Sequence, residues 1–354
     1  MLRDALIFLS ENSLVRRFSM NAPGAKSVAR RFVAGETVDD GLKASRNLVD
    51  AGFFVTLDYL GESVSSRDEA RAAADTYVTM LERIGADPVL RERVNVSLKL
   101  TQMGQDIRED SNPSARASAS ARAETADAKW PRPPRHPTPE GDTGYDEAFL
   151  LDNVKRILDT AKQHDIFVRF DMEGTPHTQR TLDFFRRLWD AGYQNIGVVL
   201  QSYLRRTAHD VDHANVLGAR VRLCKGAYKE PDEYAFQPKT EVDANYVACM
   251  ERLLSDGNYA GIATHDEAMI DATRTYSREH AVPNSGWEFQ MLYGIRRDLQ
   301  HELIDAGYSL RVYVPFGEAW YSYLMRRMAE RPANLMFIVS SVWTEMVGGR
   351  RKRA

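Results

Sequence analysis

The chain has 354 residues, and 43% of them are hydrophobic, so it can bury a large core in one or two domains. Its net charge of −3 gives no overall field that would favour nucleic acid, and its two cysteines, Cys224 and Cys249, exclude a disulfide framework. Because its apolar runs are too short to span a bilayer, we expect a cytoplasmic protein, at most peripheral to the inner face of the cytoplasmic membrane.

Helical patterns open the chain, at about residues 2–20 and 24–34, and we interpret 1–50 as an N-terminal helical segment. After residue 50, short runs of β-branched and aromatic residues alternate with helical stretches. The eight predicted strands are Phe53–Leu60, Val94–Thr101, Ile166–Glu173, Ile196–Tyr203, Arg220–Tyr228, Gly261–His265, Trp287–Leu292 and Ser309–Phe316. The predicted helices that follow them lie at about 68–84, 146–164, 176–191, 205–217, 240–256, 267–280, 296–306 and 318–330.

This alternation is typical of a parallel sheet covered by helices, and most of the strands carry the long apolar runs of strands buried on both faces. Eight such units predict a closed (βα)₈ barrel, the TIM barrel of the α/β class, over residues 51–340. An open doubly wound sheet is the alternative. No GxGxxG motif follows a predicted strand, which favours the barrel.

Residues 106–144 interrupt the pattern in the second strand-to-helix connection. They are rich in Ala, Ser, Arg and Pro and nearly free of large aliphatic residues, which predicts a disordered insertion. The alternative is a lid or a partner-docking loop anchored by Trp130. The basic segment 341–354 is predicted to be a flexible tail.

Polar residues stand at the carboxyl ends of seven consecutive predicted strands, where barrel enzymes place their chemistry. Most are donors, and Asp171 is the carboxylate that we expect to point inward. Such a ring suits a flat, partly anionic ligand together with a second small anion. It shows neither a facing pair of carboxylates nor a cluster of metal ligands. The donors are Lys99, Gln201, Arg222, Lys225, Thr264, His265 and Gln290.

Two adjacent arginines, Arg326 and Arg327, lie in an apolar and aromatic helix. Tyr323 precedes them by three and four residues and Glu330 follows them by the same spacing, so all four share one helical face. Guanidinium groups pair bidentately with carboxylate or phosphate. The doublet therefore predicts a pocket for a small anion with an apolar body, the alternative being a solvated basic stripe.

Six segments, taken in order over about residues 20–340, resemble proline dehydrogenase, specifically its single-function bacterial form. The segment in strand 5 departs from the pattern, because Cys224 stands where valine is usual. The six are Asp171-Met172-Glu173, Val199-Leu-Gln201, Arg222-Leu-Cys-Lys225-Gly-Ala-Tyr228, Ala263-Thr-His265, Phe289-Gln-Met-Leu-Tyr293 and Tyr323-Leu-Met-Arg326-Arg327. The resemblance implies a distorted barrel whose final helix sits over its mouth.

The resemblance also implies roles for individual residues. Asp171 and Arg222 would be catalytic, with Arg222 beside the flavin N5. Glu330 would lie near the adenosine or in ion pairs of the final helix. The substrate would contact Lys99, Arg326, Arg327, Tyr313, Tyr323, Leu292 and Ala227. FAD would be held by Met172, Gln201, Lys225, Gly226, Ala227, Thr264, His265 and Gln290, and no metal is expected.

The activity implied by the resemblance is FAD-dependent oxidation of L-proline to 1-pyrroline-5-carboxylate, with hydride transfer to the flavin. Electrons would pass to membrane quinone, and a separate pyrroline-5-carboxylate dehydrogenase would take the product. Two alternatives remain open on the residues alone. One is a barrel aldolase or decarboxylase that forms a Schiff base through Lys99 or Lys225. The other is a non-catalytic binding barrel that docks partners through residues 106–144.

Overall fold

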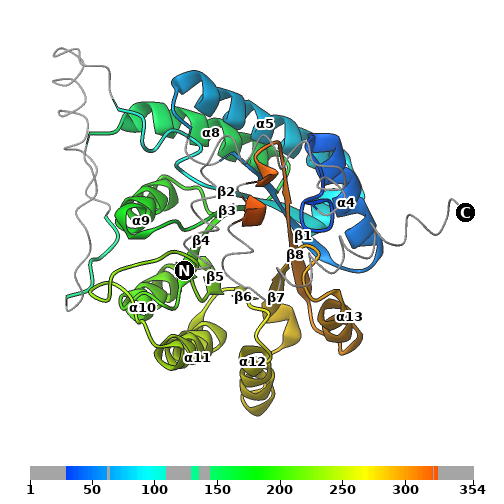
Figure 1. Ribbon diagram of the computed structural model, residues 1–354, viewed down its shortest axis with the longest axis vertical. Helices are drawn as coiled ribbons and strands as arrows, with labels where there is room; N and C mark the ends of the chain where they lie inside the picture. The colour runs from blue at the N-terminus through cyan, green and yellow to red at the C-terminus, as the bar shows by residue number, and fades with distance from the viewer. Residues whose placement is uncertain (1–28, 62–63, 109–128, 135–143, 322, 326–354) are drawn as a thin grey trace, which may run out of the picture.

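The protein is a closed barrel of eight parallel strands, which confirms the predicted fold class (Figure 1). The computed structural model describes residues 29–61, 64–108, 129–134, 144–321 and 323–325. Each strand pairs with the next in chain order, and β8 closes the barrel on β1. The strands are β1 (Phe54–Tyr59), β2 (Val94–Leu98), β3 (Val168–Phe170), β4 (Ile196–Gln201), β5 (Arg220–Cys224), β6 (Ala260–Ala263), β7 (Trp287–Leu292) and β8 (Leu310–Phe316).

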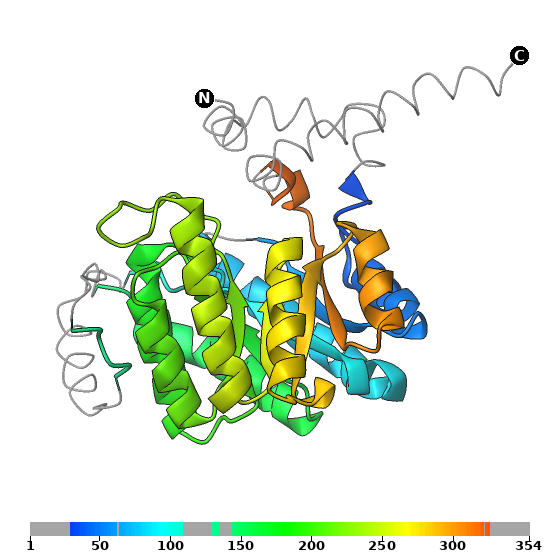
Figure 2. The same ribbon diagram turned by 90° about the horizontal axis from the view of Figure 1, so that it is seen from below.

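Helices surround the barrel, and their apolar faces pack on the outward residues of the strands (Figures 1 and 2). Seven of the predicted helices are present, as α5 and α8 to α13. Two further helices, α4 and α6, are not among the predicted ranges. The helices are α4 (Val38–Asp50), α5 (Arg67–Ala86), α6 (Pro88–Arg93), α8 (Glu147–Gln163), α9 (Thr175–Asp190), α10 (Thr207–Leu217), α11 (Lys239–Asp256), α12 (Glu267–Glu279) and α13 (Arg297–Asp305), with a short 3₁₀ turn η1 (Asn284–Gly286) before β7.

Several strands end earlier than predicted, because turns begin directly after them. After β2, the amides of Gln102 and Met103 donate to the carbonyls of Lys99 and Leu100, at 3.1 and 3.0 Å. After β5, Gly226 takes a φ of +109°, which an L side chain rarely adopts. The functional residues at these positions therefore lie on the loops over the barrel mouth rather than within the strands.

The inside of the barrel is polar, whereas the layer between strands and helices is apolar. Val55 and Leu57 of β1 are fully buried outside the barrel, among residues of the surrounding helices. The alternating residue Thr56 points inward and donates to Asn95 Oδ1 at 2.5 Å. Since successive side chains of a strand face opposite sides, this alternation supplies the barrel mouth with polar groups.

The final helical segment lies over the carboxyl ends of the strands (Figures 1 and 2). Residues 320, 321 and 323–325 are helical, and they form a small apolar cluster with Phe32, Val33 and Leu60. The Trp320 indole also donates to Glu36, at 3.3 Å. This placement agrees with the expected position of the last helix, whose remainder, together with the predicted tail 341–354, lies outside the described residues. The same is true of the predicted helix at 2–20.

The predicted disordered insertion is ordered at residues 129–134, so for these residues that prediction is wrong. Trp130 is only 1% exposed and packs against Phe185 and His213, at ring distances of 6.0 and 4.5 Å. Its indole nitrogen donates to Asp210 at 2.9 Å. The parts at 109–128 and 135–143 lie outside the described residues. Among the helices that are described, none is both long and apolar enough to cross a membrane.

Candidate active site

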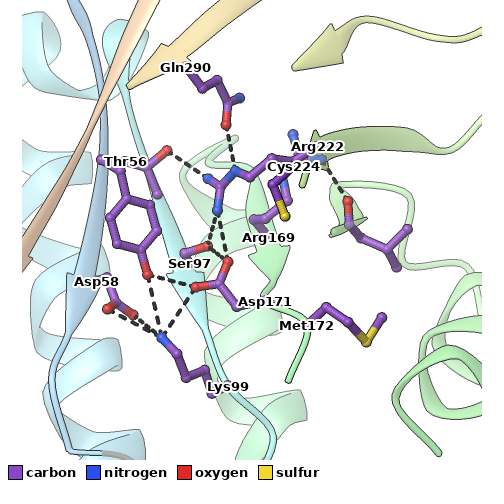
Figure 3. Close-up of polar contacts among 12 residues, drawn as sticks. Thr56, Asp58, Ser97, Lys99, Arg169, Asp171, Met172, Arg222, Cys224 and Gln290 are labelled. Atoms are coloured by element: carbon purple, nitrogen blue, oxygen red, sulfur yellow. Dashed lines mark hydrogen bonds and ion pairs between the residues drawn. The ribbon is translucent and has the colours of Figure 1, made fainter. Parts of the chain in front are cut away.

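Lys99 stands at the centre of the barrel mouth, between two carboxylates from neighbouring strands (Figure 3). Its ammonium is 3.3 Å from Asp58 Oδ1, at the end of β1, and 3.3 Å from Asp171 Oδ2, directly after β3. It also donates to the hydroxyl of Tyr313 on β8, at 3.4 Å. All three ionised groups are at least nine-tenths buried. One buried cation thus joins three strands around the barrel axis.

Asp171 is the carboxylate that links the two cations of the mouth. Its Oδ1 accepts from Ser97 Oγ at 2.6 Å and from Arg222 at 2.8 Å, and its Oδ2 accepts from the Tyr313 hydroxyl at 2.6 Å. Burial alone would raise the pKa of this carboxyl, but the charges of Lys99 and Arg222 outweigh it and hold the pKa below its usual value. Asp171 is therefore a fixed anion and acts as a hydrogen-bond acceptor.

Arg222 crosses the barrel interior from β5. Its Nε donates to Gln290 Oε1 at 2.5 Å, and a terminal nitrogen approaches Thr56 Oγ1 at 3.5 Å (Figure 3). The guanidinium also lies 5.1 Å from the centre of the Tyr313 ring, within the range of a cation–π contact. Contacts on several sides fix the plane of the guanidinium before a ligand binds. Arg222 is therefore a preorganised electrostatic group.

Three residues of this network were not singled out from the sequence: Asp58, Thr56 and Ser97. The expectation that the mouth has no facing carboxylates was wrong, because Asp58 and Asp171 flank Lys99. Lys99 and Arg222 together balance the two carboxylates, however, so neither resembles the free acid of a glycosidase. Thr56 and Asp58 alternate along an otherwise apolar strand, and this period of two could have identified them.

The residues expected to bind the cofactor lie along the β3 to β7 side of the mouth. Gln201 donates to the carbonyl of Met172 at 3.1 Å. His265 Nε2 accepts from the backbone amide of Leu292 at 3.0 Å, which identifies the neutral ring with its proton on Nδ1. Thr264 is buried, and its hydroxyl accepts from the amide of Asp266 at 3.0 Å.

Lys225 is held on the loop after β5 by two carboxylates. Its ammonium pairs with Asp243 and, at 2.7 Å, with Asp266. Burial raises the pKa of Asp266, but the hydrogen bond and charge of Lys225 outweigh this and lower it to about 2. Lys239 pairs with the same two carboxylates. Lys225 thus points toward α11 and α12, at the rim of the mouth.

Two observations fit a flat ligand with hydrogen-bonding edges on this side. The side-chain oxygen of Gln201 is buried and has no hydrogen-bond partner within the part of the chain that the structure describes. A Cβ added to Gly226 would stand 2.3 Å from the Tyr203 ring, so only glycine lets the backbone run this close. These features fit a flat ring system with hydrogen-bond donors on its edge, as the isoalloxazine of a flavin has.

The expected walls of the substrate pocket come from several elements. Tyr313 and Leu292 are half-buried on β8 and β7, and Ala227 is half-buried after β5. Tyr323 is buried in the final helical segment. Arg326, Arg327 and Glu330 lie outside the described residues, so the two-arginine clamp remains a prediction.

Fold and site together define a (βα)₈-barrel protein with a buried, charge-paired network at the carboxyl ends of its strands. The sequence profile described as proline dehydrogenase matches residues 41–340. Proline dehydrogenase 2 of Bacillus subtilis (strain 168) is 36% identical over 335 residues, which cover 95% of this chain and 96% of that protein. Proline dehydrogenase of Deinococcus radiodurans is 34% identical over 341 residues, 96% of this chain and 97% of that protein. The chain therefore belongs to the proline dehydrogenase family, a family of oxidoreductases.

Larger proteins contain a similar barrel. The crystal structure of proline utilization A from Bdellovibrio bacteriovorus, inactivated by N-propargylglycine, matches with a TM-score of 0.72. The match covers 93% of this chain and 36% of that one, at 24% sequence identity, and supports the fold. The bifunctional protein PutA of Escherichia coli (strain K12) is 27% identical over 342 residues, 88% of this chain and 24% of that protein. The resemblance to the single-function form is confirmed by the relatives that match over nearly their whole length.

Proposed function

We propose that the protein oxidises L-proline to 1-pyrroline-5-carboxylate with FAD as its cofactor. The observation that carries the proposal is the buried network of Lys99, Asp171, Arg222 and Tyr313 at the barrel mouth, in a chain of the proline dehydrogenase family. It offers cations for a carboxylate, a fixed anion between them and an aromatic wall. A small zwitterion with an apolar ring fits such a site.

The substrate carboxylate would be held by Lys99 on the barrel side and by Arg326 and Arg327 on the side of the final helix. Lys99 is already oriented by Asp58 and Asp171, so it loses little freedom when a carboxylate arrives. Tyr313, Tyr323, Leu292 and Ala227 would wall the ring and exclude water. In this arrangement the carboxylate fixes the position of the ring carbon that is oxidised.

FAD would be held by Met172, Gln201, Lys225, Gly226, Ala227, Thr264, His265 and Gln290. When bound, it would supply the acceptor for the hydride that leaves the ring carbon next to nitrogen. Arg222 would stabilise the negative charge that the transfer brings to its side of the site. Electrons would then pass to a quinone, which requires transient contact between a cytoplasmic protein and the inner face of the membrane. A separate dehydrogenase would oxidise the product.

A Schiff-base mechanism is less consistent with the geometry. It requires a free amine as nucleophile, but the side-chain nitrogens of Lys99 and Lys225 are each engaged by two carboxylates. A non-catalytic barrel is less consistent with the chain's membership of a family of oxidoreductases.

The flavin spectrum tests the proposal directly. Purified protein should show flavin absorbance bands in the blue, and anaerobic L-proline should bleach them, whereas D-proline serves as the control. Protein that carries no flavin, takes up none on reconstitution with FAD and is instead trapped on a lysine by borohydride with its substrate would overturn the proposal in favour of the Schiff-base enzyme.

A further inference from the structure

A second concave site lies at the opposite end of the barrel from the mouth. It is a hollow of about 450 Å³ at the amino ends of β3 to β6, lined by residues of the loops that enter these strands. Phe167 and Trp189 give it apolar walls. Arg220, Asp165, Asn195 and Asn258 give it polar ones. None of these residues takes part in the network at the mouth.

Arg220 is the cation of this hollow, and it is held ready for a ligand. It is exposed, yet its guanidinium lies 5.2 Å from the centre of the Phe167 ring and 5.1 Å from that of Tyr259. It has no ion pair with any residue in the described ranges. Aromatic rings restrict the guanidinium but leave its hydrogen-bonding edges for a carboxylate. An arginine placed here for stability alone would be expected to pair with an acid.

Positive charge is in excess around this end of the barrel. Arg169 and Arg311 are buried just inside it, and the buried carboxylate that pairs with Arg311 is Glu288, at 2.6 Å. Burial and the charges of Arg222, Arg311 and Arg220 lower the pKa of Arg169 well below its usual value. The Nε of Arg169 has no hydrogen-bond partner among the described residues. Glu288 offsets part of this repulsion, and an anion bound beside Arg220 would reduce it further.

Three other polar side chains of the hollow offer acceptor oxygens, and Gln194 adds a further amide. Asn195 and Asn258 donate their amide groups to the carbonyls of Ile166 and Gly218, at 3.1 and 2.7 Å, which leaves their side-chain oxygens to accept. Asp165 adds a carboxylate, so a dianion such as phosphate would meet repulsion as well as attraction. A ligand with both a carboxylate and an ammonium can pair with Arg220 through the first and with the acceptor oxygens through the second.

The backbone at the hollow is strained. Asp165 and Tyr259 both have left-handed φ values, 56° and 48°, and for a bulky residue such as tyrosine this conformation is unusual. It lets Tyr259 face Arg220 while its hydroxyl donates to Glu288 at 3.1 Å. Strain of this kind persists where the surrounding structure requires it.

We propose that this hollow binds a small zwitterionic amino acid with an apolar side chain. Its carboxylate pairs with Arg220, its ammonium with Asp165 and the amide oxygens of Asn195 and Asn258, and its side chain packs on Phe167 and Trp189. The site is separate from the proposed proline site, since the two lie at opposite ends of the barrel.

Calorimetric titration with L-leucine tests the proposal. L-Leucine should bind saturably, whereas 4-methylpentanoate, isoamylamine and inorganic phosphate should each bind at least about tenfold more weakly, because each lacks one of the paired charges or adds a repelled one. Arg220→Met and Asp165→Asn should both weaken L-leucine by at least about tenfold. Arg91→Met is the matched control, since Arg91 is exposed on α6, at the same end of the barrel but outside the hollow.

Arg220→Lys keeps the charge and should therefore retain part of the binding. This result would separate loss of the charge from misfolding. Unfolding midpoints measured for every variant show that the barrel is intact. Absence of saturable binding to the intact protein would overturn the proposal, as would binding that Arg220→Met leaves unchanged. Binding lost in Arg326→Met but retained in Arg220→Met would assign L-leucine to the barrel mouth and also overturn it. The flavin spectrum is independent of each of these results.

Discussion

Arg222 is the residue on which the electrostatics of the mouth depend. It contacts Asp171, Gln290 and Ser97, which come from three different strands or strand ends. Replacing it with Met keeps the apolar stem and removes the charge. We expect flavin reduction by saturating proline to slow by about 10²-fold or more, because a preorganised partner of the developing charge is lost. Stopped-flow absorbance measures this rate.

The control for this substitution is Arg205→Met. Arg205 lies on the loop after β4 and pairs with the exposed Asp232 at 2.7 Å, outside the network of Lys99, Asp171 and Arg222, so its loss should leave the rate unchanged. Arg222→Lys, which restores a cation, should recover part of the rate. An Arg222→Met protein with normal FAD content and the wild-type reduction rate would show that Arg222 has only a structural role.

Sequence reasoning found much of this network but not all of it. Lys99, Asp171 and Arg222 could be singled out because polar groups at strand ends are informative in a barrel. The period of two could have placed Asp58 inside the barrel, but not its pairing with Lys99, 41 positions away. A buried charge is identified by its partners, and these are fixed only when the barrel closes.

At the scale of the elements, the strands and most helices were predictable from periodicity, whereas their ends and the smallest helices were not. α4 begins with a reciprocal cap between Thr37 and Asp40, and α6 begins with Asp87 as cap before Pro88. Both are recognisable helix-start signals that could have identified these helices. The ends of β2 and β5 depend on turns whose geometry composition does not specify.

Trp130 anchors the Ala- and Pro-rich connection after β2 to two helices. Its backbone amide donates to Asp183 on α9, at 2.8 Å, and its indole to Asp210 on α10. Gln179 returns a bond to the carbonyl of Trp130 at 2.9 Å and also accepts from Arg206, which pairs with Asp210. Composition predicts disorder as an average over the whole insertion, whereas one buried aromatic residue is enough to anchor a segment locally.

We therefore expect Trp130→Ala to destabilise the protein by about 3–5 kcal/mol, the range for removing a fully buried aromatic side chain. Urea unfolding measures the loss. Trypsin should cut after Lys129 slowly in the intact protein and much faster in the variant, because cleavage there requires Trp130 to leave its site.

Trp130→Phe is the matched variant, since it keeps a ring and removes the indole donor, and it should cost less than the alanine change. Equal unfolding midpoints for Trp130→Ala and the intact protein, together with equally fast cleavage after Lys129, would show that the segment does not anchor on α9 and α10.

For the whole molecule, the barrel closes where β8 meets β1, and a buried charge on β8 bonds the strands on both sides of it. Arg311 on β8 donates to the carbonyl of Val55 on β1 at 2.8 Å and pairs with Glu288 on β7 through two bonds, at 2.6 and 3.0 Å. Periodicity predicted that eight units close into a barrel. It could not predict which interior charges pair beside the closure, because this follows from strand register.

Breaking this pair tests how far closure depends on it. Glu288→Gln keeps the shape but leaves Arg311 without its buried counterion, beside the cation of Arg169. Since removing one partner of a buried ion pair leaves an uncompensated charge, we expect a loss of about 3–5 kcal/mol in the free energy of unfolding. Urea titration at neutral pH measures it. Glu302→Gln is the control, because Glu302 pairs with Arg274 on the surface at 3.2 Å and should contribute at most about 1 kcal/mol.

The same pair has a pH signature. Burial would raise the pKa of Glu288, but the charge and hydrogen bond of Arg311 outweigh it and keep the pKa below its usual value. A carboxyl with a lowered folded-state pKa contributes stability that is present above its unfolded pKa and is lost as the pH falls through the folded one. The difference in unfolding free energy between the intact protein and Glu288→Gln should therefore shrink as the pH is lowered into the acid range, while the small difference for Glu302→Gln stays small. A Glu288→Gln protein as stable as the intact one at neutral pH would show that strand pairing and the apolar outer layer close the barrel without help from the interior charges.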